Sequence, residues 1–347
     1  MILRRKTRKV KIGNIFVGGD SPISVQSMLN KPSNDYRANV EQAKILESAG
    51  CELIRVSVND NNSVYLVSKL KENINIPVIS DIQFSSKYAI ESIIAGVDGV
   101  RINPGNMDTD GLFKVVNVCN ERNIPIRIGF NGGSVKDYVF LESNDRVNSF
   151  VSFAMNFIKL FESWEFKNMV ISLKTSSIET TVKSYEKISS LCDYPLHIGI
   201  SESGTEKSGL IRSCIGIGSL LLKGIGDTLR LSLSADPLKE VQYGIKILKF
   251  LGLRDSGVQV VSCPTCGRSS IDVEYFANEI EKKLGNLNKN IKIAVMGCPV
   301  NGPGEARDAD FGVTGVDGKC LIFKNGEILK KVDEKDLLPE LTSLIDV

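Results

Sequence analysis

The sequence predicts an α/β protein in which an N-terminal (β/α)₈ TIM barrel is followed by a small α+β domain. The chain has 347 residues, which is more than one domain of ordinary size. Short apolar segments alternate with stretches of helical spacing from residue 23 onward, and this rhythm stops near residue 250. We therefore predict a barrel over residues 1–253 and a second domain over residues 258–347.

The barrel prediction depends on eight candidate strands. They cover residues 23–28, 52–58, 77–82, 99–103, 125–130, 168–174, 195–201 and 227–233. Pro77, Pro125 and Pro195 each stand at the start of one of these segments, where a missing backbone N–H is tolerated. The intervening stretches have helical spacing, as in the run from Val40 to Leu46. Eight strand–helix alternations indicate a closed parallel barrel.

Two further regions have their own patterns. Residues 10–20 predict a short hairpin ahead of the barrel. Beyond a linker at residues 251–257, strands are expected at 258–263, 291–298 and 311–316, with helices at 271–284 and 333–346. Residues 319–332 predict a hairpin that turns at Asn325-Gly326.

Composition restricts the class of protein. The net charge of +2 gives no support for a nucleic-acid-binding protein, and no segment reaches the roughly 18 apolar residues of a membrane helix. Eight cysteines in a chain of this length are too sparse for a disulfide scaffold. We therefore expect a cytoplasmic protein with reduced thiols, in which clustered cysteines indicate a metal site.

Five of the candidate strands carry a cation inside an otherwise apolar run. They contribute Arg55, Arg101, Arg127, Lys174 and Arg230. A buried charge is costly unless it is paired, and five cations in a ring repel one another. The pattern favours a polyanion bound at the C-terminal mouth of the barrel, where barrel enzymes place their sites, because guanidinium groups hold phosphate oxygens well. The alternative is that nearby carboxylates such as Asp81 or Glu202 neutralise each cation.

Other polar residues fall near the ends of the same strands. Asp81, Asn131 and Glu202 are candidates to bind or protonate the substrate, or to orient an arginine. His197 is the only histidine and lies within an apolar strand, which favours a core histidine. A site with several histidine ligands is therefore excluded.

The second domain contains a cysteine cluster. Cys263 and Cys266 form a C-x-x-C, and Cys298 opens a turn-rich segment that ends in Glu305. This spacing fits a 4Fe-4S cluster with three thiolates and a fourth ligand of another kind. It fits equally well a structural zinc site with Cys320 as the fourth ligand. A thioredoxin-like pair leaves Cys298 unexplained.

At this point the sequence resembles the bacterial-type 4-hydroxy-3-methylbut-2-enyl diphosphate synthase family of the methylerythritol phosphate pathway to isoprenoids. The resemblance runs from about Arg8 to the last helix. It rests on the segments VQSM (25–28), IRVSV (54–58), VRINPGN (100–106), NIPIRIGFN (123–131), PLHIGISESG (195–204), GIGDTLRLSLSADP (224–237), CPTC (263–266) and CPVNGPGEA (298–306).

The resemblance implies an oxidoreductase that opens the ring of 2-C-methyl-D-erythritol 2,4-cyclodiphosphate and removes one oxygen as water. Two electrons from flavodoxin or ferredoxin reach the substrate through a 4Fe-4S cluster, and the second domain becomes an iron–sulfur domain. The implied cluster ligands are Cys263, Cys266, Cys298 and Glu305. A homodimer in which each cluster domain caps the partner's barrel is also implied.

The implied substrate contacts and catalytic residues are specific positions of this sequence. The contacts are Arg55, Arg101, Arg127, Asn131, Lys174, Arg230, Ser232, Gln83 and Asn301, and the catalytic residues are Glu202 and Glu305. One position departs from the family, which usually reads Asp-Ile-His-Phe where this chain has Asp81-Ile82-Gln83-Phe84. If the histidine binds diphosphate, Gln83 keeps a donor but lacks the positive charge.

Two alternatives without redox chemistry are ranked below this interpretation. A pterin-type, diphosphate-binding barrel enzyme with a structural four-cysteine zinc site would need no iron. A zinc-stabilised module that binds RNA would need an exposed basic face and stacking aromatic residues, whereas the arginines here lie in apolar strands.

Overall fold

A computed structural model of the chain describes residues 2–132, 145–254, 257–285, 287, 289–299, 308–316 and 318–346. The chain forms two compact units, Met1–Leu253 and Arg254–Val347. Among the helices of the described residues, none has both the length and the apolar composition needed to cross a bilayer.

The first unit is the predicted TIM barrel. Its parallel strands follow the order β8-β7-β6-β5-β4-β3-β11-β9, and a bridge between Ile171 and Leu196 links the two ends. The strands are β3 (Ser24–Met28), β4 (Leu53–Ser57), β5 (Val78–Ile82), β6 (Gly99–Ile102), β7 (Ile126–Asn131), β8 (Met169–Lys174), β9 (His197–Ile198) and β11 (Thr228–Leu229). The predicted fold class is confirmed.

Two strands are shorter than the sequence predicts. The segments predicted at 195–201 and 227–233 keep only two ladder residues each, β9 and β11. Beyond them the chain forms a separate two-stranded parallel sheet from β10 (Gly204–Thr205) and β12 (Leu233–Ser234). Between β9 and β10 Glu202 has a positive φ of 52°, and Gly204, with a φ of 104°, is the residue of β10 that pairs with Leu233.

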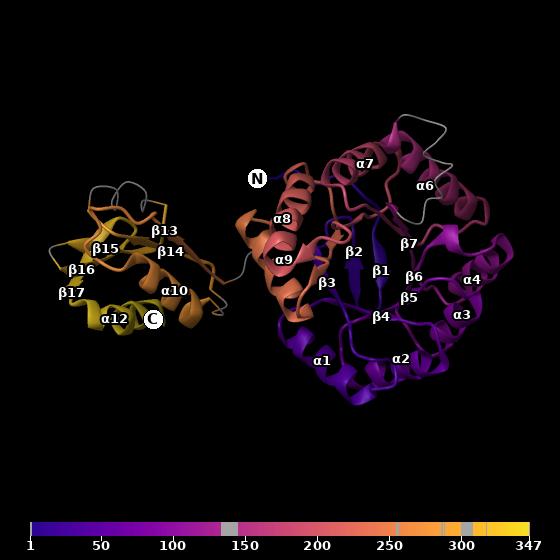
Figure 1. Cartoon of the computed structure of the whole chain (residues 1–347), viewed down its shortest axis with the longest axis horizontal. Helices are drawn as coiled ribbons and strands as arrows, with labels where there is room; N and C mark the ends of the chain where they lie inside the picture. Colours follow the sequence, from indigo (N-terminus) through magenta and orange to yellow (C-terminus); the bar gives the residue numbers. More distant parts are fainter. Residues whose placement is uncertain are drawn as a thin grey trace. The chain divides into compact units, whose positions relative to one another are not determined.

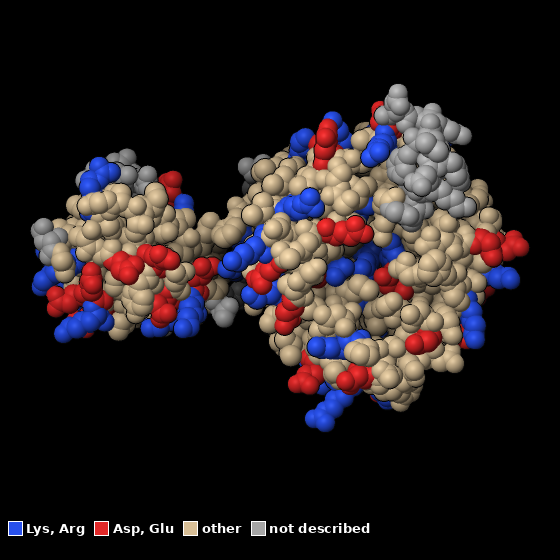
Figure 2. Space-filling model, in the orientation of Figure 1, with Lys and Arg blue, Asp and Glu red and all other residues tan. Residues whose placement is uncertain are grey.

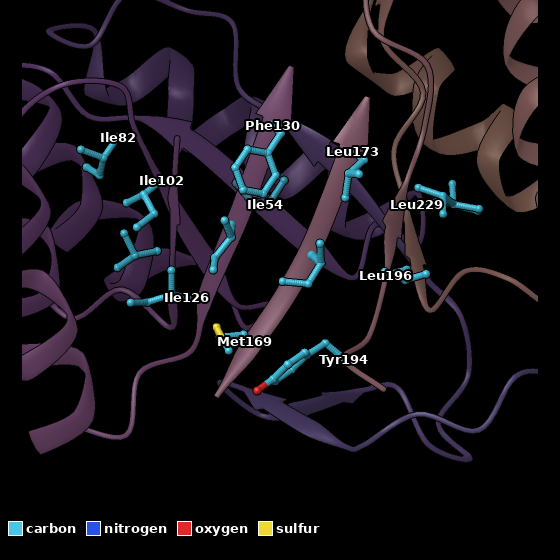
Figure 3. Packing of buried hydrophobic residues seen from close by; sticks show 14 of the residues in the cluster. Ile54, Ile82, Ile102, Ile126, Phe130, Met169, Leu173, Tyr194, Leu196 and Leu229 are labelled. Atoms are coloured by element: carbon cyan, nitrogen blue, oxygen red, sulfur yellow. The ribbon is translucent and has the colours of Figure 1, made fainter. Parts of the chain in front are cut away.

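Helices surround the barrel on its outer side (Figure 1). They are α1 (Tyr36–Ser48), α2 (Asn61–Asn73), α3 (Ser86–Ile94), α4 (Thr109–Glu121), α6 (Arg146–Ser163), α7 (Ile178–Leu191), α8 (Glu206–Leu222) and α9 (Pro237–Phe250), and a short 3₁₀ helix, η1, covers Pro104–Asn106. An Asp or Ser side chain caps the first turn of most of them, as Asp60 does in α2. Figure 3 shows apolar side chains of the outward faces of the strands, including Ile54, Ile126 and Leu173.

A hairpin closes the N-terminal end of the barrel, as predicted for residues 10–20. It consists of β1 (Val10–Ile12) and β2 (Ile15–Val17), which pair antiparallel. Val10, Ile12 and Val17 pack with the inward-facing strand residues Leu53 and Val170. The floor of the barrel is therefore apolar, and the polar inward-facing residues lie nearer the C-terminal mouth.

The second unit is an α+β domain with one five-stranded sheet in the order β13-β14-β15-β16-β17. Its strands are β13 (Val258–Ser262), β14 (Ile291–Met296), β15 (Phe311–Val316), β16 (Lys319–Lys324) and β17 (Glu327–Val332). Its helices are α10 (Val273–Leu284), the 3₁₀ helix η3 (Glu334–Asp336) and α12 (Leu337–Asp346). Strands β13, β14 and β15 are parallel, while β16 and β17 form the predicted hairpin around Asn325.

Candidate functional site

The five predicted cations converge inside the barrel mouth. They line a cavity of about 380 Å³ together with Asp81, Gln83, Asn131, Glu202 and Ser232. Figure 2 shows Lys and Arg atoms within the hollow at the centre of the barrel. The strand register explains this convergence, because side chains of alternate residues point inward and the C-terminal ends of parallel strands meet at one rim.

Two of the cations share one carboxylate. Asp81 accepts a hydrogen bond from Arg101 Nη1 at 3.0 Å and lies 3.6 Å from Arg55 Nε. Burial alone raises the pKa of Asp81, but Arg55, Arg101 and Arg127 outweigh that effect and hold it below its usual value. Gln83 Nε2 donates to the same Asp81 oxygen at 3.2 Å.

A carboxylate that the sequence analysis missed holds the fourth arginine. Glu240 of α9 is 2% exposed and accepts from Arg230 Nε and Nη2 at 3.2 and 3.3 Å. It also accepts from the backbone N–H of Leu233 at 2.9 Å. Glu202, the partner considered from sequence, instead lies exposed at the rim of the cavity.

Arg127 and Lys174 have no carboxylate partner within ion-pair distance in the described part of the chain. Arg127 Nη1 donates to Gln26 Oε1, and both cationic side chains are at most 7% exposed. Burial, and then the neighbouring guanidinium groups, hold the pKa of Lys174 well below its usual value. Burial, and then the charge of Arg55, lower the pKa of Arg127, and burial lowers the pKa of Arg55 to about 10 although Asp81 raises it.

The cavity therefore has more buried positive than negative charge, because Asp81 and Glu240 pair with only three of the five cations. Small residues make room for them. A Cβ on Gly129 would lie 2.6 Å from Arg101 Nε, and one on Gly199 would lie 2.7 Å from Lys174 Nζ. A cavity of this charge and size can hold a small polyanion such as a diphosphate.

In the second unit, two of the predicted cysteine ligands follow neighbouring parallel strands. Cys263 follows β13 and Cys298 follows β14. The backbone N–H of Gly297 donates to Cys263 Sγ at 3.2 Å, and that of Cys263 donates to the Val295 carbonyl oxygen at 3.2 Å. Cys266 is exposed in the following turn, where hydrogen bonds from the backbone and side chain of Arg268 lower its pKa.

These cysteines have the chemistry that an iron–sulfur cluster requires. A thiolate that receives a backbone N–H bond is stabilised as a ligand, and hydrogen bonds to sulfur tune such clusters. Asn301 and Glu305 lie outside the described residues. Among the residues that are described, no three His, Cys, Asp or Glu side chains are grouped as metal ligands.

Cys320 does not fit the zinc alternative. It lies on β16, three strand spacings from β13, a separation of about 14 Å at the usual spacing of neighbouring strands. It is fully buried among apolar side chains, and burial raises its pKa to about 11. Ligands of one zinc ion lie about 2.3 Å from the metal, so Cys320 is a core residue.

Comparison with known proteins identifies both units. A family model described as the GcpE TIM-barrel domain matches residues 7–245, and one described as the GcpE protein C-terminal domain matches residues 259–347. The chain is 46% identical over 345 residues to the 4-hydroxy-3-methylbut-2-en-1-yl diphosphate synthase (flavodoxin) of Clostridium perfringens. It is 49% identical over 346 residues to that of Clostridium acetobutylicum, and 99% of each protein is covered.

Solved structures give a more distant likeness. A dihydropteroate synthase from Stenotrophomonas maltophilia with active site-bound imidazole superposes with a TM-score of 0.56 at 13% identity. The superposition covers 71% of this chain and 97% of that one. At this identity the likeness concerns the barrel fold alone.

Proposed function

Because this chain belongs to the 4-hydroxy-3-methylbut-2-en-1-yl diphosphate synthase family, with two family models and near-full-length relatives in agreement, we propose that its barrel cations hold the substrate diphosphate. The chain is an oxidoreductase of the methylerythritol phosphate pathway. It converts 2-C-methyl-D-erythritol 2,4-cyclodiphosphate to (E)-4-hydroxy-3-methylbut-2-enyl diphosphate. Two electrons and two protons enter, and one oxygen leaves as water. The alternative of a non-redox barrel with a zinc site is not favoured.

The main support for the proposed substrate site is the excess of buried positive charge in the cavity. Among the described residues Arg127 and Lys174 lack an ion-pair partner, which an entering anion supplies, whereas Arg55, Arg101 and Arg230 are oriented beforehand by Asp81 and Glu240. Such preorganised donors bind a diphosphate without paying to reorient. Asn131, Ser232 and Gln83 line the same cavity, and Asn301 completes the proposed contacts.

Glu202 is proposed as the acidic residue next to the reacting carbon. It lies at the rim of the cavity, above the buried cations, and its φ of 52° fixes its backbone in a conformation that non-glycine residues seldom adopt. A carboxyl group at the rim of the cavity can hold the proton that the departing oxygen needs to leave as water.

A 4Fe-4S cluster is proposed for the second unit, held by Cys263, Cys266, Cys298 and Glu305. When bound, it supplies the two electrons one at a time. The N–H bond that Gly297 donates to Cys263, and the position of Cys298 after the neighbouring parallel strand, support this proposal. A carboxylate is a more readily replaced iron ligand than a thiolate, which is why Glu305 is also proposed as catalytic. Flavodoxin, named in the titles of the relatives, or ferredoxin is the proposed donor.

The assembly is proposed as a homodimer, carried over from the family resemblance, in which the cluster unit of one protomer caps the barrel of its partner. A cytoplasmic location is likewise a proposal, based on reduced thiols. Neither a membrane nor a nucleic acid is a proposed partner.

The substrate site is tested by titrating the full-length protein with the cyclodiphosphate. Arg127→Leu removes a buried cation from the cavity, whereas Arg122→Leu removes an exposed one at the end of α4. We expect Arg127→Leu to weaken binding by about 1.5–3 kcal/mol and Arg122→Leu to leave it unchanged. Equal affinities for wild type and Arg127→Leu would contradict the proposed site.

A further inference from the structure

A second polar layer lies inside the barrel beneath the cations. Ser24 of β3, Thr228 of β11 and His197 of β9 are register partners on three neighbouring strands. All three are at most 3% exposed. Two residues further along β3, Gln26 lies at the height of Arg127 and accepts its hydrogen bond.

Most polar atoms of this layer lack a partner within the described part of the chain. Ser24 Oγ, Thr228 Oγ1 and both ring nitrogens of His197 make no hydrogen bond. Directly above them, Gln26 Nε2 and Arg127 Nη2 are also without one. Buried polar atoms of native proteins are satisfied by protein or by ordered water, and these six unpartnered atoms in adjacent positions point to a bound ligand that contacts several of them.

The size and chemistry of the layer fit water. A cavity of about 10 Å³, close to the smallest space that holds one water molecule, lies against Thr228 of this layer and against Arg127, and apolar residues such as Ile12, Leu53 and Val170 form the rest of its lining. A cation is disfavoured by Lys174 and Arg127, and no larger anion fits. Burial, and then Lys174 and Arg127, lower the pKa of His197 well below its usual value, so its neutral ring offers one donor and one acceptor.

We propose that Ser24, Thr228 and His197 bind an ordered water that positions the Arg127 guanidinium from below. The water accepts from Arg127 Nη2 and Gln26 Nε2, and donates to the hydroxyl oxygen of Thr228 or Ser24 and to the unprotonated ring nitrogen of His197. His197 is thus a positioning residue, since it acts on the substrate only through Arg127. This inference rests on the proposed function in one respect, namely that Arg127 contacts the diphosphate.

The test uses Thr228→Val, which replaces the hydroxyl by a methyl group of similar size, in the full-length protein. Thr314→Val is the matched control, because Thr314 Oγ1 is also buried and unpartnered but lies in the second unit. A crystal structure of each protein shows whether the layer contains ordered density. Calorimetric titration with inorganic diphosphate gives the affinity, and thermal unfolding confirms that each variant folds.

We expect density within hydrogen-bond distance of Thr228 Oγ1 and His197 in wild type, and its loss in Thr228→Val. Diphosphate affinity falls about three- to tenfold, the scale of one hydrogen bond, and the thermal midpoint falls. Thr314→Val leaves the affinity unchanged. Ser24→Ala gives the same readout if Thr228→Val fails to fold.

If the wild-type crystal structure shows no ordered density in this layer, the proposed water site is wrong. A higher thermal midpoint for Thr228→Val than for wild type leads to the same conclusion, because removal of a truly unpartnered hydroxyl is stabilising. Density in wild type together with unchanged affinity in Thr228→Val overturns the positioning role. If the wild-type protein binds no diphosphate, both the proposed function and the positioning role are contradicted. The crystallographic density in the layer then tests the water site by itself.

Discussion

At the residue scale, the buried cations differ in how much each depends on the substrate. Arg101 and Arg230 have carboxylate partners at 3.0 and 3.2 Å, whereas Lys174 has none among the described residues and is surrounded by guanidinium groups. The charge of Lys174 is therefore the one most strongly coupled to an incoming anion.

This coupling predicts a pH dependence. The pKa of Lys174 is lowered in the free protein, and a bound diphosphate raises it again, so binding takes up a proton above the lowered pKa. Affinity for inorganic diphosphate should fall as the pH rises through that value, and Lys174→Met should weaken this dependence, leaving the part that comes from the other cations and from diphosphate itself. Titrations across the neutral and alkaline range check this, and identical pH profiles for both proteins would contradict it.

The same shift affects folding with a defined sign. The unfolded chain binds the Lys174 proton more tightly than the folded chain does. The free energy of unfolding therefore increases as the pH rises from the lowered pKa of Lys174 to its ordinary pKa. Diphosphate reduces this contribution by stabilising the protonated form.

Gln83 gives a second prediction at this scale. Its side chain lines the cavity and donates to Asp81, where the family usually has histidine. Gln83→His adds a positive charge at acidic pH, and we expect the cyclodiphosphate to bind about 1–2 kcal/mol more tightly there. Gln83→Leu, which removes the donor, should bind more weakly than wild type. If Gln83→His binds no more tightly, a neutral donor is sufficient at this position.

The sequence revealed those site residues that lie in a recognisable local pattern and missed the others. The cations stand out because each interrupts an apolar strand, and the structure brings all five into one cavity. Glu240 was missed because a glutamate in an amphipathic helix normally faces solvent. Gln26 and the polar role of His197 also depend on contacts across the barrel, which a single sequence does not display.

At the scale of elements, small residues on the strands control where the cations lie. Gly129 of β7 accepts from Arg101 Nη2 through its carbonyl oxygen at 3.2 Å, and its missing side chain leaves room for the guanidinium. The ion pair of Arg101 with Asp81 fixes that group, so it cannot simply move aside.

Gly129→Ala should therefore displace Arg101 and weaken diphosphate binding by about 1.5–3 kcal/mol, the cost of a disrupted hydrogen bond to a charged group. Gly99→Ala is the matched control, because its new methyl group on β6 would make only ordinary contacts of 3.5 Å with Ile12 and 3.6 Å with Ile79, away from the diphosphate cavity. Calorimetric titration of both variants separates the two. An unaltered affinity in Gly129→Ala would mean that the position of Arg101 does not matter.

Most elements follow from local pattern, and the exceptions have an identifiable cause. Apolar runs, three of which begin with a proline, predicted all eight barrel strands. The early ends of β9 and β11 were not predictable, because the residues beyond them form a separate pairing of β10 with β12. That pairing joins segments far apart in sequence.

At the scale of the whole molecule, the proposal assigns diphosphate binding to the first unit and the cluster thiolates to the second. Cys298→Ser should lose most of the bound iron, because it removes a proposed cluster ligand, whereas Cys320→Ser should retain it, because Cys320 is a core residue on β16. Iron analysis of anaerobically purified variants, with thermal unfolding as the control for folding, gives the comparison. Retention of full iron by Cys298→Ser would rule out that ligand.

The most direct test of the central claim, that a cluster in the second unit reduces a diphosphate held in the barrel, is an anaerobic spectrum with iron analysis. We predict a brown protein with about four irons per chain, which forms hydroxymethylbutenyl diphosphate when the cyclodiphosphate and a strong reductant are added. A colourless anaerobic protein that carries one tightly bound zinc and no iron would contradict the account.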